Sequence, residues 1–249
     1  MIVFAALSAG AYGGGTLTGM TSALTAYRVL VGIGIGGEYP SGSVAAAEAT
    51  AELKSGTRNR WFIFATNFQL DIGFVAGTLV PMIVVLATTE NHLRAAWRIS
   101  LGIAVVIPII LLILRSKLKE PEEYNRAKMT KYPYGLILRY YWFRLLTVSI
   151  IWFIYDMLTY SFSIFSTQWL LIILGTDAPL WKVLGWGTLI NVFYVPGSAI
   201  GAPLSDFLGP KYCLVLGVTI QGTIGFIMTG IYKYLDTPAH VAGFVVIYG

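Results

Sequence analysis

Three side chains with useful chemistry recur at four-residue intervals in one long apolar segment. Trp152, Asp156 and Tyr160 stand at positions i, i+4 and i+8 within IIWFIYDMLTYSFSIF. In a helix each is turned by only about 40° from the one before and lies about 6 Å further along, so the three share one stripe. A carboxylate in apolar surroundings is a candidate proton carrier, because a low dielectric disfavours its charged form. Alternatively, Asp156 pairs statically with a basic residue and the two aromatic residues lie at a membrane interface.

A second carboxylate lies near the middle of another apolar block, at residues 26–49. Glu38 is followed there by Tyr39 and Pro40. A charge at membrane depth is costly and normally faces a cavity or a partner, so it indicates a functional site. Arg28 lies near the end of the block, where its long side chain can reach the membrane interface.

The same block contains a run of glycines, GIGIGG, that superficially resembles a dinucleotide-binding turn. We reject that interpretation because no strand precedes the run and no βαβ unit comes after it. Small residues let helices approach closely in lipid, so we expect Gly32 and Gly36 to lie at a helix contact.

Polar residues also interrupt the next apolar block. Gln69, Gly73 and Gly77 repeat every four residues, so they lie on one helix face. On that face a polar side chain is next to two glycines that let another helix approach closely. A purely structural hydrogen bond between helices is the alternative for Gln69. Asp71 points about 200° away from Gln69, and the sequence assigns it no role.

The block at residues 183–208 reads as a broken helix, because it contains Asn191, Pro196 and Pro203. It ends in GAPLSDFLGPK, where we expect Asp206 to cap or pin a turn before Lys211.

Composition determines what kind of elements must position these residues. The 249-residue chain is 56% hydrophobic and only 12% charged, whereas about 25% charge is usual in soluble domains. Its mean hydropathy is +0.71. The apolar blocks reach membrane-spanning length, so we expect an all-α membrane protein with about seven full transmembrane helices and part of an eighth. The expected spans are residues 2–20, 26–49, 61–87, 97–114, 143–174, 183–208, 212–232 and a last block from 241. Neither end looks like a natural terminus, so the chain is expected to be a fragment.

The distribution of cations predicts the orientation in the membrane. If successive gaps alternate sides, 12 of the 17 Lys and Arg residues fall on one side and 17 − 12 = 5 on the other. The richer side is assigned to the cytoplasm. Residues 115–142 form its longest polar segment, which we interpret as a central cytoplasmic loop, either a solvated basic linker or an interfacial helix. This loop separates two bundles, at residues 1–114 and 143–249.

Several function classes find no support. One cysteine and two histidines provide neither an internal disulfide nor a metal ligand cluster, and no cofactor is expected. The net charge of +5 is explained by cytoplasmic loops, so no nucleic-acid partner is expected. No Ser, His and Asp constellation appears, and the paired carboxylates Glu122 and Glu123 lie in the loop, so we expect no enzyme.

Taken together, these segments resemble a major facilitator superfamily transporter from its third helix to the start of its tenth. The resemblance covers the whole chain and is carried by the glycine helix that Arg28 leads, by NRWFIFATNFQLDIG, by the loop with KEPEEY and by the turn SDFLGPK. It implies a helical bundle in which Arg28, Gly32, Gly36, Asp206 and Lys211 serve structure and gating.

Within that superfamily, GIGIGGEYP followed by Gln69 and the Trp152 stripe is similar to the phosphate:proton symporters, and most to fungal permeases for glycerophosphodiesters or inorganic phosphate. The resemblance implies that five residues line the substrate cavity: Tyr39, Gln69, Trp152, Asp156 and Tyr160. It links Glu38 and Asp156 to proton movement. The membrane lysine that this family places opposite the aspartate is absent from this chain.

The expected function is therefore proton-coupled symport of a phosphate-containing anion by alternating access. The expected partners are the small anionic substrate, protons and the lipid bilayer, with a monomer in the plasma membrane as the full-length form. A sugar or monocarboxylate transporter of the same superfamily and a non-transporting nutrient sensor are the alternatives.

Overall fold

A computed structural model describes residues 1–51, 53–54, 56–117, 133–175, 177–235 and 237–249. Within these ranges the regular structure is entirely helical, which confirms the expected all-α class. The elements are α1 (Ile2–Ala9), α2 (Leu17–Ala51), α3 (Arg58–Thr88), η1 (Glu90–His92), α4 (Leu93–Arg115), α6 (Tyr134–Leu174), α7 (Leu180–Val192), α8 (Tyr194–Leu208), α9 (Pro210–Leu235), η2 (Pro238–His240) and α10 (Val241–Tyr248).

Within the described ranges, five helical segments are long and apolar enough to cross a membrane. They are Arg58–Thr88, Glu90–Arg115, Tyr134–Leu174, Leu180–Leu208 and Pro210–Leu235. Four of these match expected spans closely. The fifth, α6, begins at Tyr134, so residues 134–142 of the expected central loop are helical. Residues 118–132 of that loop, with KEPEEY, lie outside the described ranges.

The expected first span, residues 2–20, is wrong. Helix α1 is only eight residues long, and Gly14 and Gly15 then adopt positive φ angles of 63° and 82°. Glycine reaches these angles without steric cost, so the chain turns here. A Cβ on Gly13 would overlap the backbone of Gly19 and Met20, so the turn also depends on close backbone approach. The 35-residue helix α2 begins directly after this turn, at Leu17.

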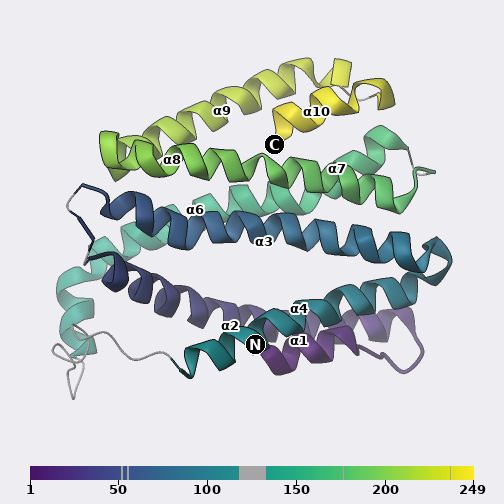
Figure 1. Cartoon of the computed structure of the whole chain (residues 1–249), viewed down its shortest axis with the longest axis horizontal. Coiled ribbons are helices and arrows are strands. Elements are labelled where there is room, and N and C mark those ends of the chain that lie inside the picture. Colours follow the sequence, from purple (N-terminus) through teal and green to yellow (C-terminus); the bar gives the residue numbers. More distant parts are fainter. Residues whose placement is uncertain (52, 55, 118–132, 176, 236) are drawn as a thin grey trace.

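The expected break in the block at residues 183–208 is confirmed. Helix α7 ends at Val192 and α8 begins at Tyr194, with Phe193 between them. The two short helices run on in one direction and together have membrane-spanning length (Figure 1).

Helix α3 occupies the centre of the molecule (Figure 1). It packs along α7 and α8 on one side and against α2 and α4 on the other, while α1 packs on α4 and α2. We call α1–α4 the first half and α6–α10 the second half. The largest buried apolar cluster lies in the second half, where α6, α7 and α10 meet around Leu170, Ile190 and Phe244.

Large apolar side chains also cover the outside of the bundle. Helix α4 exposes Ile103, Ile107 and Ile110, and the first turns of α6 expose Tyr140 and Phe143. A surface of this kind is unfavourable in water and suits a lipid environment.

Candidate binding site between the two halves

Two predicted site residues from different halves of the molecule meet in the structure. The hydroxyl oxygens of Tyr39 on α2 and Tyr160 on α6 are 3.2 Å apart, within hydrogen-bonding distance. Asp156 lies one turn before Tyr160 on α6 and is half-buried. The structure therefore brings together three of the five expected cavity residues.

Aromatic rings extend this contact to two further helices. The ring of Phe74 on α3 lies 6.3 Å from that of Tyr160 and 6.0 Å from that of Tyr194. Tyr194 is the first residue of α8, directly after the break. These separations are typical of favourable aromatic pairs. Sequence reasoning missed Phe74 and Tyr194, because aromatic residues are common in membrane spans and nothing local distinguishes these two.

The structure also gives Asp71 a place. Asp71 on α3 lies near Ser198 and Tyr194 on α8, while the Ser198 hydroxyl donates to the Val195 carbonyl at 3.1 Å. Asp71 thus belongs to the contact between α3 and α8. We call Tyr39, Tyr160, Phe74, Tyr194 and the adjacent Asp156 the central cluster.

Two expected cavity residues do not join the central cluster. The side chain of Trp152 is 56% exposed, and its ring contacts only the neighbouring Tyr155, at 5.9 Å, among the aromatic pairs of the described ranges. Gln69 is exposed, and its side chain forms no hydrogen bond with any described residue. Trp152 shares a stripe of α6 with Asp156 and Tyr160, and Gln69 lies on α3, but neither is seen in contact with Tyr39 among the described residues.

Glu38 forms an ion pair with Arg115, the last residue of α4. Each side chain is 45% exposed, so the attraction is modest. Sequence reasoning assigned Arg115 to the loop and therefore missed it as the partner of Glu38. The role of Glu38 in proton movement stays a prediction.

The expected helix contact at Gly32 and Gly36 is absent from the described part of the chain. A Cβ at either position would meet no atom within 4 Å. Of the four glycines in the run, Gly34 alone has such a neighbour, Met1 at 3.0 Å. Arg28 is exposed and forms no ion pair with a described residue.

Asp206 binds α3 of the first half and does not act only within its own turn. One carboxylate oxygen accepts a hydrogen bond from the backbone N–H of Arg60 at 3.1 Å, and the other lies 3.3 Å from the Arg60 Nε. Arg60 is in the first turn of α3, where backbone N–H groups lack partners within the helix. The carboxylate thus caps α3 from α8, favoured by the helix dipole. Lys211 is exposed and lies over the ring of Tyr212 instead.

Two more polar contacts join α3 to the second half. In the middle, the buried Asn191 amide donates to the Phe74 carbonyl and to the Thr78 hydroxyl, both at 3.2 Å. Just beyond the far end of α3, the Glu90 carboxylate accepts the Leu180 N–H at 2.5 Å. The two halves are therefore joined through α3 at both ends and near the centre.

Comparison with known proteins gives a consistent picture. A family model described as "Sugar (and other) transporter" matches residues 1–131. The whole chain is 43% identical to a glycerophosphodiester transporter and 42% identical to a major glycerophosphoinositol permease, both of Candida albicans, and covers 47% of each. An inorganic phosphate transporter of Toxoplasma gondii is 26% identical over 85% of the chain and 37% of its own length.

The chain spans about half the length of the curated relatives it matches most strongly. No solved structure gives a significant match.

Proposed function

Because the chain belongs to the sugar (and other) transporter family of the major facilitator superfamily, we propose that it is part of a proton-coupled symporter for phosphate-containing anions. The substrates are glycerophosphodiesters or inorganic phosphate, in keeping with the names of its relatives. The chain is a multi-pass membrane protein, and we place the full-length carrier in the plasma membrane as a monomer.

The observation that carries the proposal is the contact between the hydroxyl groups of Tyr39 and Tyr160 across the two halves. The two hydroxyl groups are hydrogen-bonding partners of each other. A phosphate group entering between α2 and α6 would replace that contact, since each hydroxyl can donate to a phosphate oxygen. Gln69 and Trp152 would add donors as the halves close around the anion.

Asp156 supplies the link to protons in this mechanism. It lies one turn from Tyr160 on the same face of α6. A second negative charge beside the phosphate is unfavourable at membrane depth, so Asp156 takes up a proton together with the anion. Release of both on the other side then completes the cycle.

The contacts at the two ends of α3 supply the gates. Alternating access requires the two halves to rock about a site near the midplane. Separation of Arg60 from Asp206 would open the predicted cytoplasmic end, and separation of Glu90 from Leu180 would open the other end.

Uptake by the full-length protein that contains this segment tests the proposal. Cells expressing it should take up labelled glycerophosphoinositol or inorganic phosphate faster at acidic external pH. Asp156→Asn should abolish this uptake, while Asp177→Asn, in the exposed connection between α6 and α7, should leave it intact. Normal acid-stimulated accumulation in Asp156→Asn would refute the proton-carrying role.

The second candidate function is a sugar or monocarboxylate carrier, which the breadth of the matched family supports. Substrate competition distinguishes it from the phosphate-anion symporter. Excess glycerophosphodiester should inhibit uptake only under the first proposal, and excess hexose or lactate only under the second.

A further inference from the structure

A pocket with two arginines lies at the end of the bundle opposite the predicted cytoplasmic loop. It has a volume of about 420 Å³ and is lined by Asn91, His92, Arg94, Ala95 and Arg98. These residues belong to η1 and to the first turns of α4. We call it the α4 pocket; it lies outside the central cluster.

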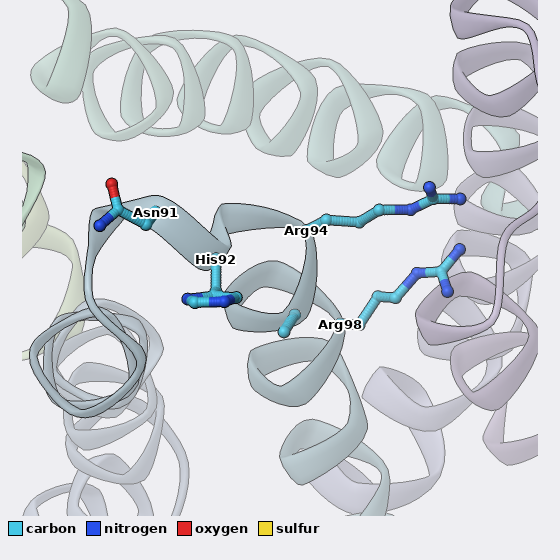
Figure 2. Close-up of a pocket in the computed structure, with 5 residues that line it drawn as sticks. Asn91, His92, Arg94 and Arg98 are labelled. Carbon is cyan, nitrogen blue, oxygen red and sulfur yellow. The ribbon is translucent and has the colours of Figure 1, made fainter.

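The two guanidinium groups have no acidic partner among the described residues. Arg94 and Arg98 are four residues apart on one face of α4 and extend in the same direction (Figure 2). Neither forms an ion pair with a carboxylate of the described ranges. Glu90, the carboxylate nearest in sequence, is held by the N–H of Leu180. Two like charges that share a pocket without compensation favour an anion between them.

Arg98 is held in place yet keeps a free donor. One of its terminal nitrogens donates to the Ala11 carbonyl at 3.0 Å, and its guanidinium lies 5.3 Å from the centre of the Trp97 ring. Its Nε is buried without a hydrogen-bond partner among the described residues. Because the Nε is enclosed, a ligand oxygen in the pocket would meet the other terminal nitrogen of Arg98, which donates to no described residue.

The residues that line the pocket stand at the start of α4. His92 stands at the N-cap position, and its side chain makes no capping hydrogen bond. The first N–H groups of the 23-residue helix α4 therefore lack a side-chain cap. Together with the helix dipole, this arrangement favours a phosphate group over a neutral ligand.

We propose that the α4 pocket binds the phosphate group of an anion on the non-cytoplasmic side, separately from the central cluster. Guanidinium groups suit this ligand because they donate paired hydrogen bonds to phosphate oxygens. The pocket raises the local concentration of substrate at the outer end of the carrier; this part rests on the proposed function, whereas phosphate binding itself does not.

Direct binding of inorganic phosphate to the purified full-length protein tests the site. Because Trp97 contacts Arg98, its fluorescence should change on binding, and the change should vanish in Trp97→Phe. Arg94→Gln removes an exposed side chain with no hydrogen bond to described residues, so the fold should persist. We expect its Kd for phosphate to rise about tenfold. Lys182→Gln, in the first turn of α7 and outside the pocket, is the matched control and should bind normally.

Three results would overturn the inference. These are the absence of a Trp97-dependent response to phosphate, equal affinities in Arg94→Gln and Lys182→Gln, and full binding by an Arg94→Gln, Arg98→Lys double variant that folds normally.

The phosphate group could belong to a free anion or to a lipid headgroup, and nanodiscs distinguish these sources. A response to inorganic phosphate that persists in discs containing phosphatidylinositol assigns the site to the free anion. A response lost in those discs but present in phosphatidylcholine discs, with the same dependence on Arg94, assigns it to the headgroup.

Uptake assays then separate failure of this inference from failure of the proposed function. If the site feeds the carrier, Arg94→Gln should raise KM and leave kcat unchanged, and it should weaken the effect of added salt on KM. Phosphate binding without any uptake would refute the proposed function and leave the α4 pocket intact. Uptake with the same KM in Arg94→Gln and in Lys182→Gln would refute the feeding role alone.

Discussion

The contact between Asp206 and Arg60 should control how often the predicted cytoplasmic end opens. It joins the end of α8 to the start of α3 through a hydrogen bond to a backbone N–H and an ion pair. Asp206→Ala removes both contacts at once, so it should favour the open state if these contacts hold the gate closed. The first turn of α3 then loses an acceptor that the closed state provides and the open state does not.

The expected magnitude depends on the exposure of the two side chains. Loss of a capping acceptor costs about 1 kcal/mol. Because the acceptor here is a charged carboxylate, the expected cost rises to about 1.5 kcal/mol. The ion pair adds about 0.5 kcal/mol, because the Arg60 side chain is 39% exposed although that of Asp206 is only 12% exposed. A total of about 2 kcal/mol corresponds to an open population about 30-fold larger. Asp206→Asn keeps an acceptor oxygen but loses the charge, so about 1 kcal/mol and a change of about fivefold are expected.

Cysteine labelling from the cytoplasmic side measures this population. Ser205, beside Asp206, is 2% exposed, so a Ser205→Cys side chain reacts when this end of α8 is uncovered. Native cysteines, Cys213 included, are first replaced by serine. The labelling rate should rise about 30-fold in Asp206→Ala and about fivefold in Asp206→Asn.

Two controls decide whether the contact itself is responsible. Asp177→Ala, at the opposite end of the bundle, should not change the labelling rate. A double variant Asp206→Ala, Arg60→Ala should open no further than Asp206→Ala, because Asp206→Ala already removes both contacts with Arg60. Equal labelling in Asp206→Ala and Asp177→Ala would show that this contact does not hold the gate closed.

Three further predictions concern the other contacts. Asn191→Ala should lower the free energy of unfolding by about 1 to 3 kcal/mol, seen as a lower Tm in detergent, because the Phe74 carbonyl and Thr78 hydroxyl lose their donor; an unchanged Tm would contradict this. Tyr160→Phe should raise the KM for phosphate uptake about tenfold while Tyr155→Phe leaves it unchanged, and equal effects would argue against a specific role of the Tyr160 hydroxyl. Glu38→Gln should cost less than about 1 kcal/mol of stability, since its ion pair is half-exposed, yet should reduce the acid stimulation of uptake; a normal pH response would remove Glu38 from the proton path.

Some properties of this protein are determined by the sequence alone because they depend on neighbours along the chain. Long apolar segments indicate a membrane. The membrane in turn requires helices here, since every backbone polar group in lipid must be paired within its own segment. The spacing of Trp152, Asp156 and Tyr160 places them on one stripe of α6 wherever that helix packs. The break before Tyr194 was likewise predictable from the Asn and Pro content of its span. The failure at residues 2–20 has a local cause, because α1 ends at Ala9 within an apolar run and Gly14 and Gly15 turn the chain before α2 begins.

Other properties were decided only by the tertiary structure, because they depend on how far each helix is shifted along its neighbours and which face it turns to them. The contact between Tyr39 and Tyr160 joins residues 121 positions apart, and that between Arg60 and Asp206 joins residues 146 positions apart. No local pattern records such a pairing. The partner of Glu38 was equally hidden, since it depends on where α4 ends beside α2. The sequence therefore determined which side chains each helix offers on one face, and packing decided which of them meet.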